Sequence, residues 1–283
     1  MPLPPGGPCH TPALIDLHVH STCSCGGASS IAEYARQATA LGVVEVGFCE
    51  HLDLDRRDRD YNHLNPVWYA QELAAAQAVS NGVCLRRGVE VTYQARLEGE
   101  LRTWLAGHAW DYVVVSVHLM DYPDGWALVS EPSALGAYFA THSQRQAYLP
   151  YFEEVCRAAR SGLGDVLGHM DVVKRYGIRQ YGPFDPAAFG EEIRAVLRAA
   201  IDGGVGLEIN TSGLRQSPGE PYPALTVLRW YRELGGEVLT IGSDAHQALD
   251  LGAGIAEALA MVRQAGFRAI ATFEERQIRW IDL

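Results

Sequence analysis

The sequence lacks the motifs that mark several large enzyme classes. It contains no GxSxG motif, no Walker A loop and no GxGxxG fingerprint. Serine-hydrolase, P-loop and dinucleotide-binding interpretations therefore have no support. Its six cysteines include no CxxC pair, and we expect no disulfide framework.

The chain also lacks an excess of basic residues. It has 23 Lys and Arg against 34 Asp and Glu, a net charge of -11, whereas a nucleic-acid partner requires clustered Lys and Arg. No apolar run approaches the ~20 residues of a membrane span. The first twelve residues, rich in Pro and Gly, lack the basic start and apolar core of a secretion signal. We expect a soluble cytoplasmic protein with no nucleic-acid or membrane partner and with residues 1–12 as a flexible tail.

What is present fits one α/β domain spanning residues 1–283. No low-complexity linker or internal repeat divides the chain, and 48% of it is hydrophobic, which is typical of a globular enzyme. Short runs rich in Val, Ile and Leu alternate with helix-like stretches. The runs are residues 13–18, 43–49, 83–91, 112–117, 165–169, 206–210 and 237–242. Strands buried on both faces have this composition, so we predict seven parallel strands in a barrel or a doubly wound sheet.

Two helix-like stretches carry specific boundary signals. Ser30 is placed to cap a helix, Glu33 to complete a capping box, and Gly42 to end it. Residues 137–160 read as one long helix, which Pro150 is expected to kink or interrupt.

The predicted strand ends carry the side chains that bind transition metals. Six of the seven ends have a His, Asp or Glu, and six of the ten histidines of the chain lie there. These histidines are His18, His20, His51, His118, His169 and His246. In a barrel and in a doubly wound sheet alike, catalytic and ligand-binding residues lie at the carboxyl ends of the strands. The histidines at these ends therefore predict a metal site.

The spacing supports a site with more than one ion. Residues two apart in an extended segment point to the same side, so His18 and His20 can bind one ion. Asp244 and His246 have the same spacing. The carboxylate of Glu90 can bridge two cations, and a hydroxide held between two metals can attack phosphorus. Each residue alone is as easily an ordinary buried side chain; the combination in strand order carries the prediction.

Several motifs together resemble the polymerase and histidinol phosphatase (PHP) superfamily. They are DLHVHS, CEHL, GVEV, SVHLMD, GHMDVVKRYG, EINTSGLR and GSDAH, spread over residues 14–265. The resemblance implies a distorted (β/α)7 barrel with a two- or three-metal site at its carboxyl-terminal face. EINTSGLR and GHMDVVKRYG resemble the histidinol-phosphate phosphatase branch, which implies hydrolysis of L-histidinol phosphate to L-histidinol and phosphate in histidine biosynthesis.

The resemblance also implies a ligand set. The first metal would be held by His18, His20, Glu90 and Asp244. Glu90 would bridge to a second metal, held by His118 and His169, and a third would be held by His51 and His246. Asp244 or His246 would assist proton transfer.

One position departs from the family pattern. Where the family has an Asp or His a few residues after the HxH pair, this chain has Cys25. A thiolate there would favour zinc or iron over manganese; alternatively, Cys25 is a small loop residue and the third site is weak. Cys23 is the less favoured substitute.

Basic residues that resemble the phosphate-binding residues of the family follow two strand ends. Arg215 follows Asn210, and Lys174 and Arg175 follow His169. A phosphate dianion is held well by a guanidinium fork, and the alternative for each residue is a solvated surface cation. Segments 52–66 and 119–132 are candidates for the rest of the substrate pocket, with Asp53 or Asp171 facing the ammonium group.

Three other functions are weighed against this one. A PHP phosphoesterase could act on a nucleotide or sugar phosphate instead, and a barrel that had lost turnover could serve as a metal-binding module. An amidohydrolase lacks support because no Lys lies at a strand end to be carbamylated. The sequence does not indicate the oligomeric state.

Overall fold

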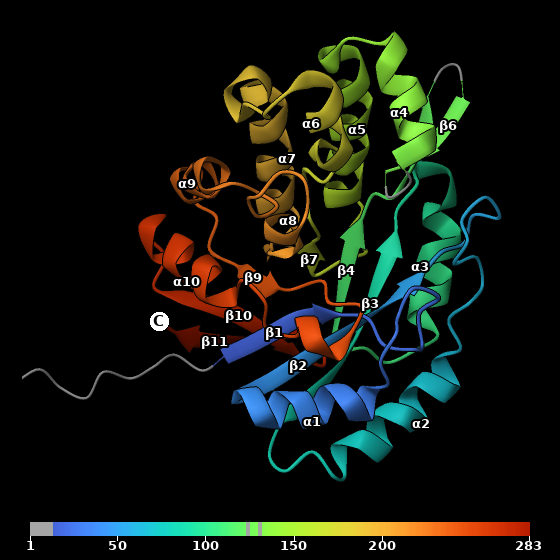
Figure 1. Ribbon diagram of the computed structural model, residues 1–283, viewed down its shortest axis with the longest axis vertical. Helices are drawn as coiled ribbons and strands as arrows, with labels where there is room; N and C mark the ends of the chain where they lie inside the picture. The colour runs from blue at the N-terminus through green and yellow to red at the C-terminus, as the bar shows by residue number, and fades with distance from the viewer. Residues whose placement is uncertain (1–13, 123–124, 130–131) are drawn as a thin grey trace, which may run out of the picture.

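The computed structural model describes residues 14–122, 125–129 and 132–283. Its main sheet has seven parallel strands in the order β1-β2-β3-β4-β7-β8-β9 (Figure 1). The strands are β1 (Leu14–Val19), β2 (Val43–Leu52), β3 (Cys84–Thr92), β4 (Tyr112–Ser116), β7 (Val166–Leu167), β8 (Gly206–Asn210) and β9 (Leu239–Gly242). All seven coincide with the predicted runs; the expected tail, residues 1–12, lies outside the described residues.

The two edges of this sheet meet just beyond β1 and β9. The backbone N–H of Asp244 donates to the carbonyl of His18 at 2.7 Å, and the N–H of His20 donates to the carbonyl of Ala245 at 2.8 Å. These bonds bring the first and last strands together. The sheet is therefore a nearly closed barrel, as the family resemblance implied, and the doubly wound alternative is wrong.

Helices surround the barrel (Figure 1). They are α1 (Ile31–Leu41), α2 (Pro66–Gln77), α3 (Glu98–Ala106), α4 (Pro132–Thr141), α5 (Gln144–Arg160), α6 (Lys174–Tyr181), α7 (Gly190–Asp202), α8 (Ser212–Arg215), α9 (Leu225–Glu233) and α10 (Ile255–Gln264), with short 3-10 turns at Ala95–Leu97, Pro186–Phe189 and Ala248–Asp250. Within the described ranges, none of the helices has the length and apolar character needed to cross a bilayer.

The helix-boundary predictions have mixed outcomes. The capping box between Ser30 and Glu33 and the left-handed Gly42 at the end of α1 are confirmed. The single helix over 137–160 is wrong, because α4 ends at Thr141 and Ser143 caps the start of α5. Pro150 lies inside α5, which continues through it. The interruption therefore comes from the capping serine rather than from the proline.

Two hairpins were not predicted. They are β5 (Leu119–Tyr122) with β6 (Gly125–Leu128), and β10 (Ala269–Glu274) with β11 (Gln277–Asp282). Phe273 of β10 packs in a buried cluster with Ile15, Tyr112 and Val166, which lie at the starts of β1, β4 and β7. The β10–β11 hairpin therefore covers the amino-terminal end of the barrel and leaves the other end for the site.

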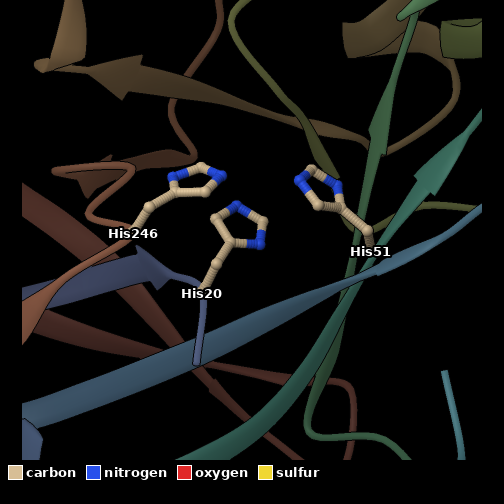
Figure 2. A group of neighbouring side chains, drawn as sticks. All are labelled: His20, His51 and His246. Carbon is tan, nitrogen blue, oxygen red and sulfur yellow. The ribbon is translucent and has the colours of Figure 1, made fainter. Parts of the chain in front are cut away.

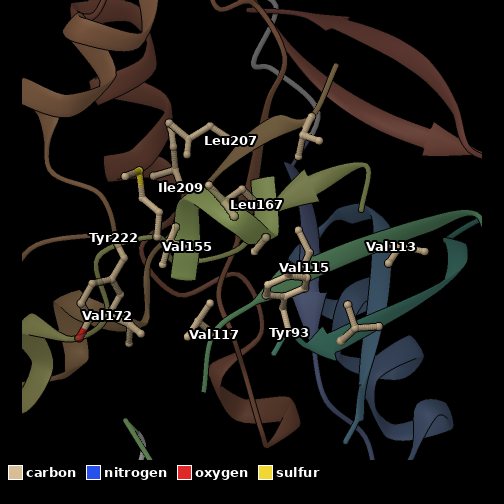
Figure 3. Close-up of a cluster of buried hydrophobic side chains, with 14 of the residues drawn as sticks. Tyr93, Val113, Val115, Val117, Val155, Leu167, Val172, Leu207, Ile209 and Tyr222 are labelled. Atoms are coloured by element: carbon tan, nitrogen blue, oxygen red, sulfur yellow. The ribbon is translucent and has the colours of Figure 1, made fainter. Parts of the chain in front are cut away.

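The opposite face of β4 packs against the helices. Val113, Val115 and Val117 lie in the main core with Leu167 of β7 and with Val155 of α5 (Figure 3). Because β4 is buried on both faces, its sequence is continuously apolar rather than alternating.

The ring of Tyr112 requires a strand neighbour without a side chain. Its hydroxyl donates to the carbonyl of Leu17 at 2.7 Å, and a Cβ at Gly47 would lie 2.1 Å from that hydroxyl oxygen. Glycine at this position therefore permits the buried ring to lie against the sheet.

We expect Gly47→Ala to lower the free energy of unfolding by about 1–3 kcal/mol, because the new methyl group overpacks the site. Urea unfolding measures the change. The matched control is Gly99→Ala in α3, where a Cβ meets nothing within 4 Å and helix propensity favours alanine. Equal unfolding free energies for the two variants would contradict this account of Tyr112.

Candidate metal centre

The carboxylate of Glu90, at the end of β3, lies at the centre of a histidine cluster. Glu90 is fully buried, and its Oε1 lies 2.9 Å from Nε2 of His169 and 3.3 Å from Nε2 of His118. Its Oε2 lies 3.2–3.5 Å from nitrogens of three more rings, those of His18, His20 and His51. One carboxylate thus faces imidazoles that lie in, or within two residues after, β1, β2, β4 and β7.

A second group of rings lies beside it. His20, His51 and His246 point toward one another (Figure 2), with donor atoms within 4.8 Å of one another. Asp244 Oδ1 lies 3.5 Å from Nε2 of His20 and 3.5 Å from Nδ1 of His246. The structure therefore places His20 next to the predicted third-site residues as well as next to its predicted partner, His18.

The backbone at Asp244 adopts a conformation that few residues other than glycine adopt. Its φ is 54°, in the left-handed region, and such conformations cluster at functional sites because the surrounding structure has to enforce them. The N–H bond to His18 described above supplies that constraint. This backbone bond holds the segment so that Asp244 and His246 face the histidine cluster.

The donor set fits divalent metal ions. Buried polar atoms normally have a hydrogen-bond partner, but among the described residues Nδ1 of His20 and Nδ1 of His169 have none. Nδ1 of His51 and Oε2 of Glu90 lie 3.2 Å apart without forming an aligned hydrogen bond. Nε2 of His18 lies 3.1 Å from Nε2 of His20, and Nε2 of His118 lies 3.2 Å from Nε2 of His169. Each such pair holds at most one shared proton, whereas a cation between the nitrogens satisfies both. Nitrogen and carboxylate donors in this ratio suit zinc and similar ions.

The electrostatics of the cluster keep the carboxylate charged and one ring neutral. Burial alone would raise the pKa of Glu90, but the charges of His118 and His18 hold that pKa well below its usual value. Burial and the neighbouring His51 and His246 push the pKa of His20 well below its usual value. A neutral imidazole offers a lone pair, which is what a metal requires.

Glu208 on β8 was not among the predicted site residues. Its Oε1 lies 2.5 Å from Nδ1 of His18, and its Oε2 accepts from the backbone N–H of His169 at 2.9 Å and from the side chain of Asn210 at 3.2 Å. A carboxylate on Nδ1 fixes the tautomer that leaves Nε2 free for a metal. The signal in the sequence was a charged residue inside the apolar run GLEIN.

The predicted phosphate-binding residues lie in different environments. Arg175 lines the cavity described below, and no carboxylate of the described residues lies within ion-pair distance of its guanidinium. Lys174, the only lysine of the chain, is buried and donates to Asp171 at 2.8 Å and to Glu220 at 2.9 Å. Arg215 is exposed and donates to the carbonyl of Ser243 at 2.7 Å.

Cys23 and Cys25 belong to none of the metal-donor groups formed by the described residues. Cys25 is exposed, and its backbone N–H donates to Asp60 Oδ1 at 3.1 Å. Its thiol belongs to none of the donor groups that the described residues form. Burial and the nearby Glu50 raise the pKa of Cys23 to about 12, so that thiol stays protonated. Ligation by Cys25 stays a prediction.

The histidine cluster opens into a cavity of about 350 Å³, within the range of small-ligand sites. Segment 52–66 contributes Asp53, Asp58, Arg59 and Asp60 to its wall, and Leu128 and Val129 come from segment 119–132. The remaining lining residues are His51, Glu90, His118, His169, Val172, Arg175, Ser212, Gln216, Asp244 and His246. Residues 123–124 and 130–131 of the second segment lie outside the described residues. Asp171 bonds Lys174 and is absent from this wall.

A nearly closed barrel of seven parallel strands with a carboxylate-centred histidine cluster at its carboxyl end defines a metal-dependent enzyme. Residues 16–212 match the family model of the PHP domain. The chain belongs to the PHP family.

Relatives of known name agree with this assignment. A Deinococcus radiodurans protein named "Probable histidinol-phosphatase" is 31% identical over 276 residues, covering 94% of this chain and 98% of the relative. The Bacillus subtilis histidinol-phosphatase is 27% identical and covers 84% and 95% of the two chains. The crystal structure of Lactococcus lactis histidinol phosphate phosphatase with zinc, L-histidinol and phosphate superposes with a TM-score of 0.82 at 26% identity, covering 94% and 98%.

We expect Glu208→Gln to weaken metal binding about 10–100-fold, the usual cost of losing such a support. The glutamine amide lacks the negative charge that holds the ring of His18. If its oxygen faces His18, its NH2 group faces the backbone N–H of His169 and cannot accept a hydrogen bond from it. Competition with a chromogenic chelator measures the affinity. The exposed Glu257→Gln on α10 is the matched control. Unchanged affinity in Glu208→Gln would remove Glu208 from this role.

Proposed function

We propose that this protein hydrolyses L-histidinol phosphate to L-histidinol and phosphate, as a step of histidine biosynthesis. The observation that carries the proposal is the Glu90-centred histidine cluster opening onto a cavity that also contains Arg175. The names of the relatives, and the zinc, L-histidinol and phosphate bound in the Lactococcus lactis structure, support the choice of substrate.

The proposal assigns each ligand as follows. His18, His20, Glu90 and Asp244 hold one ion, and Glu90 bridges to a second held by His118 and His169. His51 and His246 hold a third ion, with Cys25 as its least supported ligand. We propose two or three ions of zinc, iron or manganese.

Bound there, divalent ions would activate water and neutralise charge on the phosphoryl oxygens. Arg175 is assigned to the phosphate because it lines the cavity without a carboxylate partner among the described residues. Lys174 and Arg215 are assigned to the same end of the substrate in a supporting role. The Lys174 ammonium ties Glu220 to the segment after His169, and Arg215 bonds the residue before Asp244.

Proton transfer to the leaving oxygen is assigned to Asp244 and His246. Nδ1 of His246 lies 3.2 Å from the backbone carbonyl of Asp244, a hydrogen bond that favours the tautomer with the proton on that nitrogen. The side chain of His246 is 36% exposed, which lets it reach a substrate in the cavity.

The location and partners of the protein are proposed from this reaction. The chain would act as one catalytic domain in the cytoplasm, on a small phosphorylated substrate, without a nucleic-acid or membrane partner.

A screen of phosphomonoesters with the metal-replete protein tests the function. L-Histidinol phosphate should exceed nucleotide and sugar phosphates in kcat/KM, and Glu90→Ala should abolish hydrolysis because it removes the central carboxylate. A clear preference for a nucleotide or sugar phosphate would replace the substrate assignment. Release of phosphate from no monoester would favour a non-catalytic metal-binding module.

We expect Arg175→Ala to lower kcat/KM for L-histidinol phosphate by about 10–100-fold, since it removes a charge-assisted contact worth roughly 1.5–3 kcal/mol. Steady-state kinetics on metal-replete protein measures the change. Arg179→Ala, in the same helix, is the control because Arg179 does not line the cavity. Equal kcat/KM in the two variants would exclude Arg175 from the phosphate site.

A further inference from the structure

One carboxylate of β1 belongs to none of the ligand sets described above. Asp16 lies two residues before His18 and is fully buried. In the described part of the chain, no basic side chain forms an ion pair with it. A buried carboxylate is costly unless hydrogen bonds satisfy it, so its bonding partners indicate its role in the fold.

The carboxylate of Asp16 accepts hydrogen bonds from three backbone N–H groups. Its Oδ1 accepts from His18 at 3.3 Å and from Ser243 at 2.8 Å. Its Oδ2 accepts from Gly252 at 2.9 Å. A single side chain of β1 therefore reaches two points in the chain after β9.

The two distant donors enclose one loop. Residues 243–252 follow β9 and lead toward α10, and they include Asp244 and His246. Asp16 holds the first residue of this loop through Oδ1 and the last through Oδ2. Its bond to Ser243 lies directly before Asp244, whose left-handed backbone, with φ of 54°, has to be enforced by the surrounding structure.

The middle of the loop is held by other contacts. The hydroxyl of Tyr34 donates to the carbonyl of Ala245 at 2.8 Å, and the N–H of Ala28 donates to the carbonyl of His246 at 2.7 Å. Loss of the Asp16 bonds should therefore displace the loop without releasing it. Such a displacement moves ligand atoms while the barrel stays folded.

The displacement would not affect every ion equally. Under the proposed ligand assignment, Asp244 belongs to the first ion and His246 to the third. The second ion is assigned to Glu90, His118 and His169, none of which lies in the loop. The first and third ions should depend on the position of the loop, and the second should not.

Resting on the proposed function, we propose that Asp16 is a positioning residue of the metal centre. Its carboxylate fixes both ends of the 243–252 loop before any ion is bound. Asp244 and His246 are thereby held against His20, with Oδ1 of Asp244 3.5 Å from Nε2 of His20. Asp16 does not line the cavity; it raises metal affinity by preorganising residues that do.

The test compares Asp16→Asn with the wild type. Asparagine keeps one acceptor oxygen, but its NH2 group cannot accept from the N–H that faces it. We expect the ions assigned to Asp244 and His246 to bind about 10–100-fold more weakly. After dialysis against buffered zinc, elemental analysis should find fewer ions per chain than in the wild type but at least one, and competition with a chelator gives the affinities.

Glu45→Gln is the matched control. Glu45 is another buried carboxylate, on the neighbouring strand β2, and it accepts from Nε of Arg86 at 2.9 Å and from the hydroxyl of Thr272, away from the loop. Its substitution should lower the free energy of unfolding and leave the number of bound ions unchanged. An equal loss of ions in the two variants would reflect general destabilisation and would overturn the proposal.

The outcomes separate the positioning role from the function. Wild-type ion content and affinity in folded Asp16→Asn would overturn the positioning role and leave the phosphatase intact. Loss of every ion, including the one assigned to Glu90, His118 and His169, would also contradict it, because the effect has to be selective. A wild type that binds zinc but hydrolyses no phosphomonoester would instead refute the proposed function.

Hydrogen exchange tests the same claim without a variant. Among the described residues, the N–H groups of Ser243 and Gly252 donate only to Asp16, so their exchange rates report these two bonds. Both should stay protected in the metal-replete and in the metal-stripped wild type, because Asp16 rather than an ion holds them. Exchange as fast as that of an exposed amide after stripping would show that the ions hold the loop, and would overturn the proposal even if Asp16→Asn does not fold.

Discussion

The site depends on the closure of the barrel between β1 and the segment after β9. Two backbone bonds, from Asp244 to His18 and from His20 to Ala245, join residues more than 220 positions apart. They place the first and last predicted ligands of the chain side by side. Without that closure the strand ends would still carry histidines, but those on β1 and after β9 would not face one set of ions.

Closure of the barrel brings buried imidazoles together, and two carboxylates stabilise the resulting cluster. Glu90 contacts rings from four strands, and Glu208 holds one of those rings from behind while accepting from the backbone of another ligand, His169. Together they fix which nitrogens face the ions. The remaining unpaired donors in the cluster are those a divalent cation would satisfy.

Residues of both charge signs line the cavity onto which the cluster opens. Arg175 contributes a guanidinium, and Asp53, Asp58 and Asp60 contribute carboxylates.

Much of this could be predicted from the sequence, because buried parallel strands and their carboxyl ends leave a direct pattern. All seven strands and the histidines that follow them were found in that way. Glu208 was missed because a carboxylate inside an apolar strand has no diagnostic spacing, and its two partners, His18 and His169, are distant in sequence. The burial of Lys174 could not be foreseen, since a lysine beside an arginine reads as surface until Asp171 and Glu220 are brought around it. The break between α4 and α5 was missed because the Ser143 capping signal lies inside a continuous helical pattern that also contains Pro150.

The central claim is that the Glu90 cluster holds the ions on which hydrolysis depends. The most direct measurement strips the protein with a chelator and follows L-histidinol phosphate hydrolysis as zinc, iron or manganese is returned in counted amounts. The account predicts that activity is absent without metal and rises to its full value only when more than one ion is bound per chain. Full activity in the stripped protein, or saturation well below one ion per chain, would contradict it.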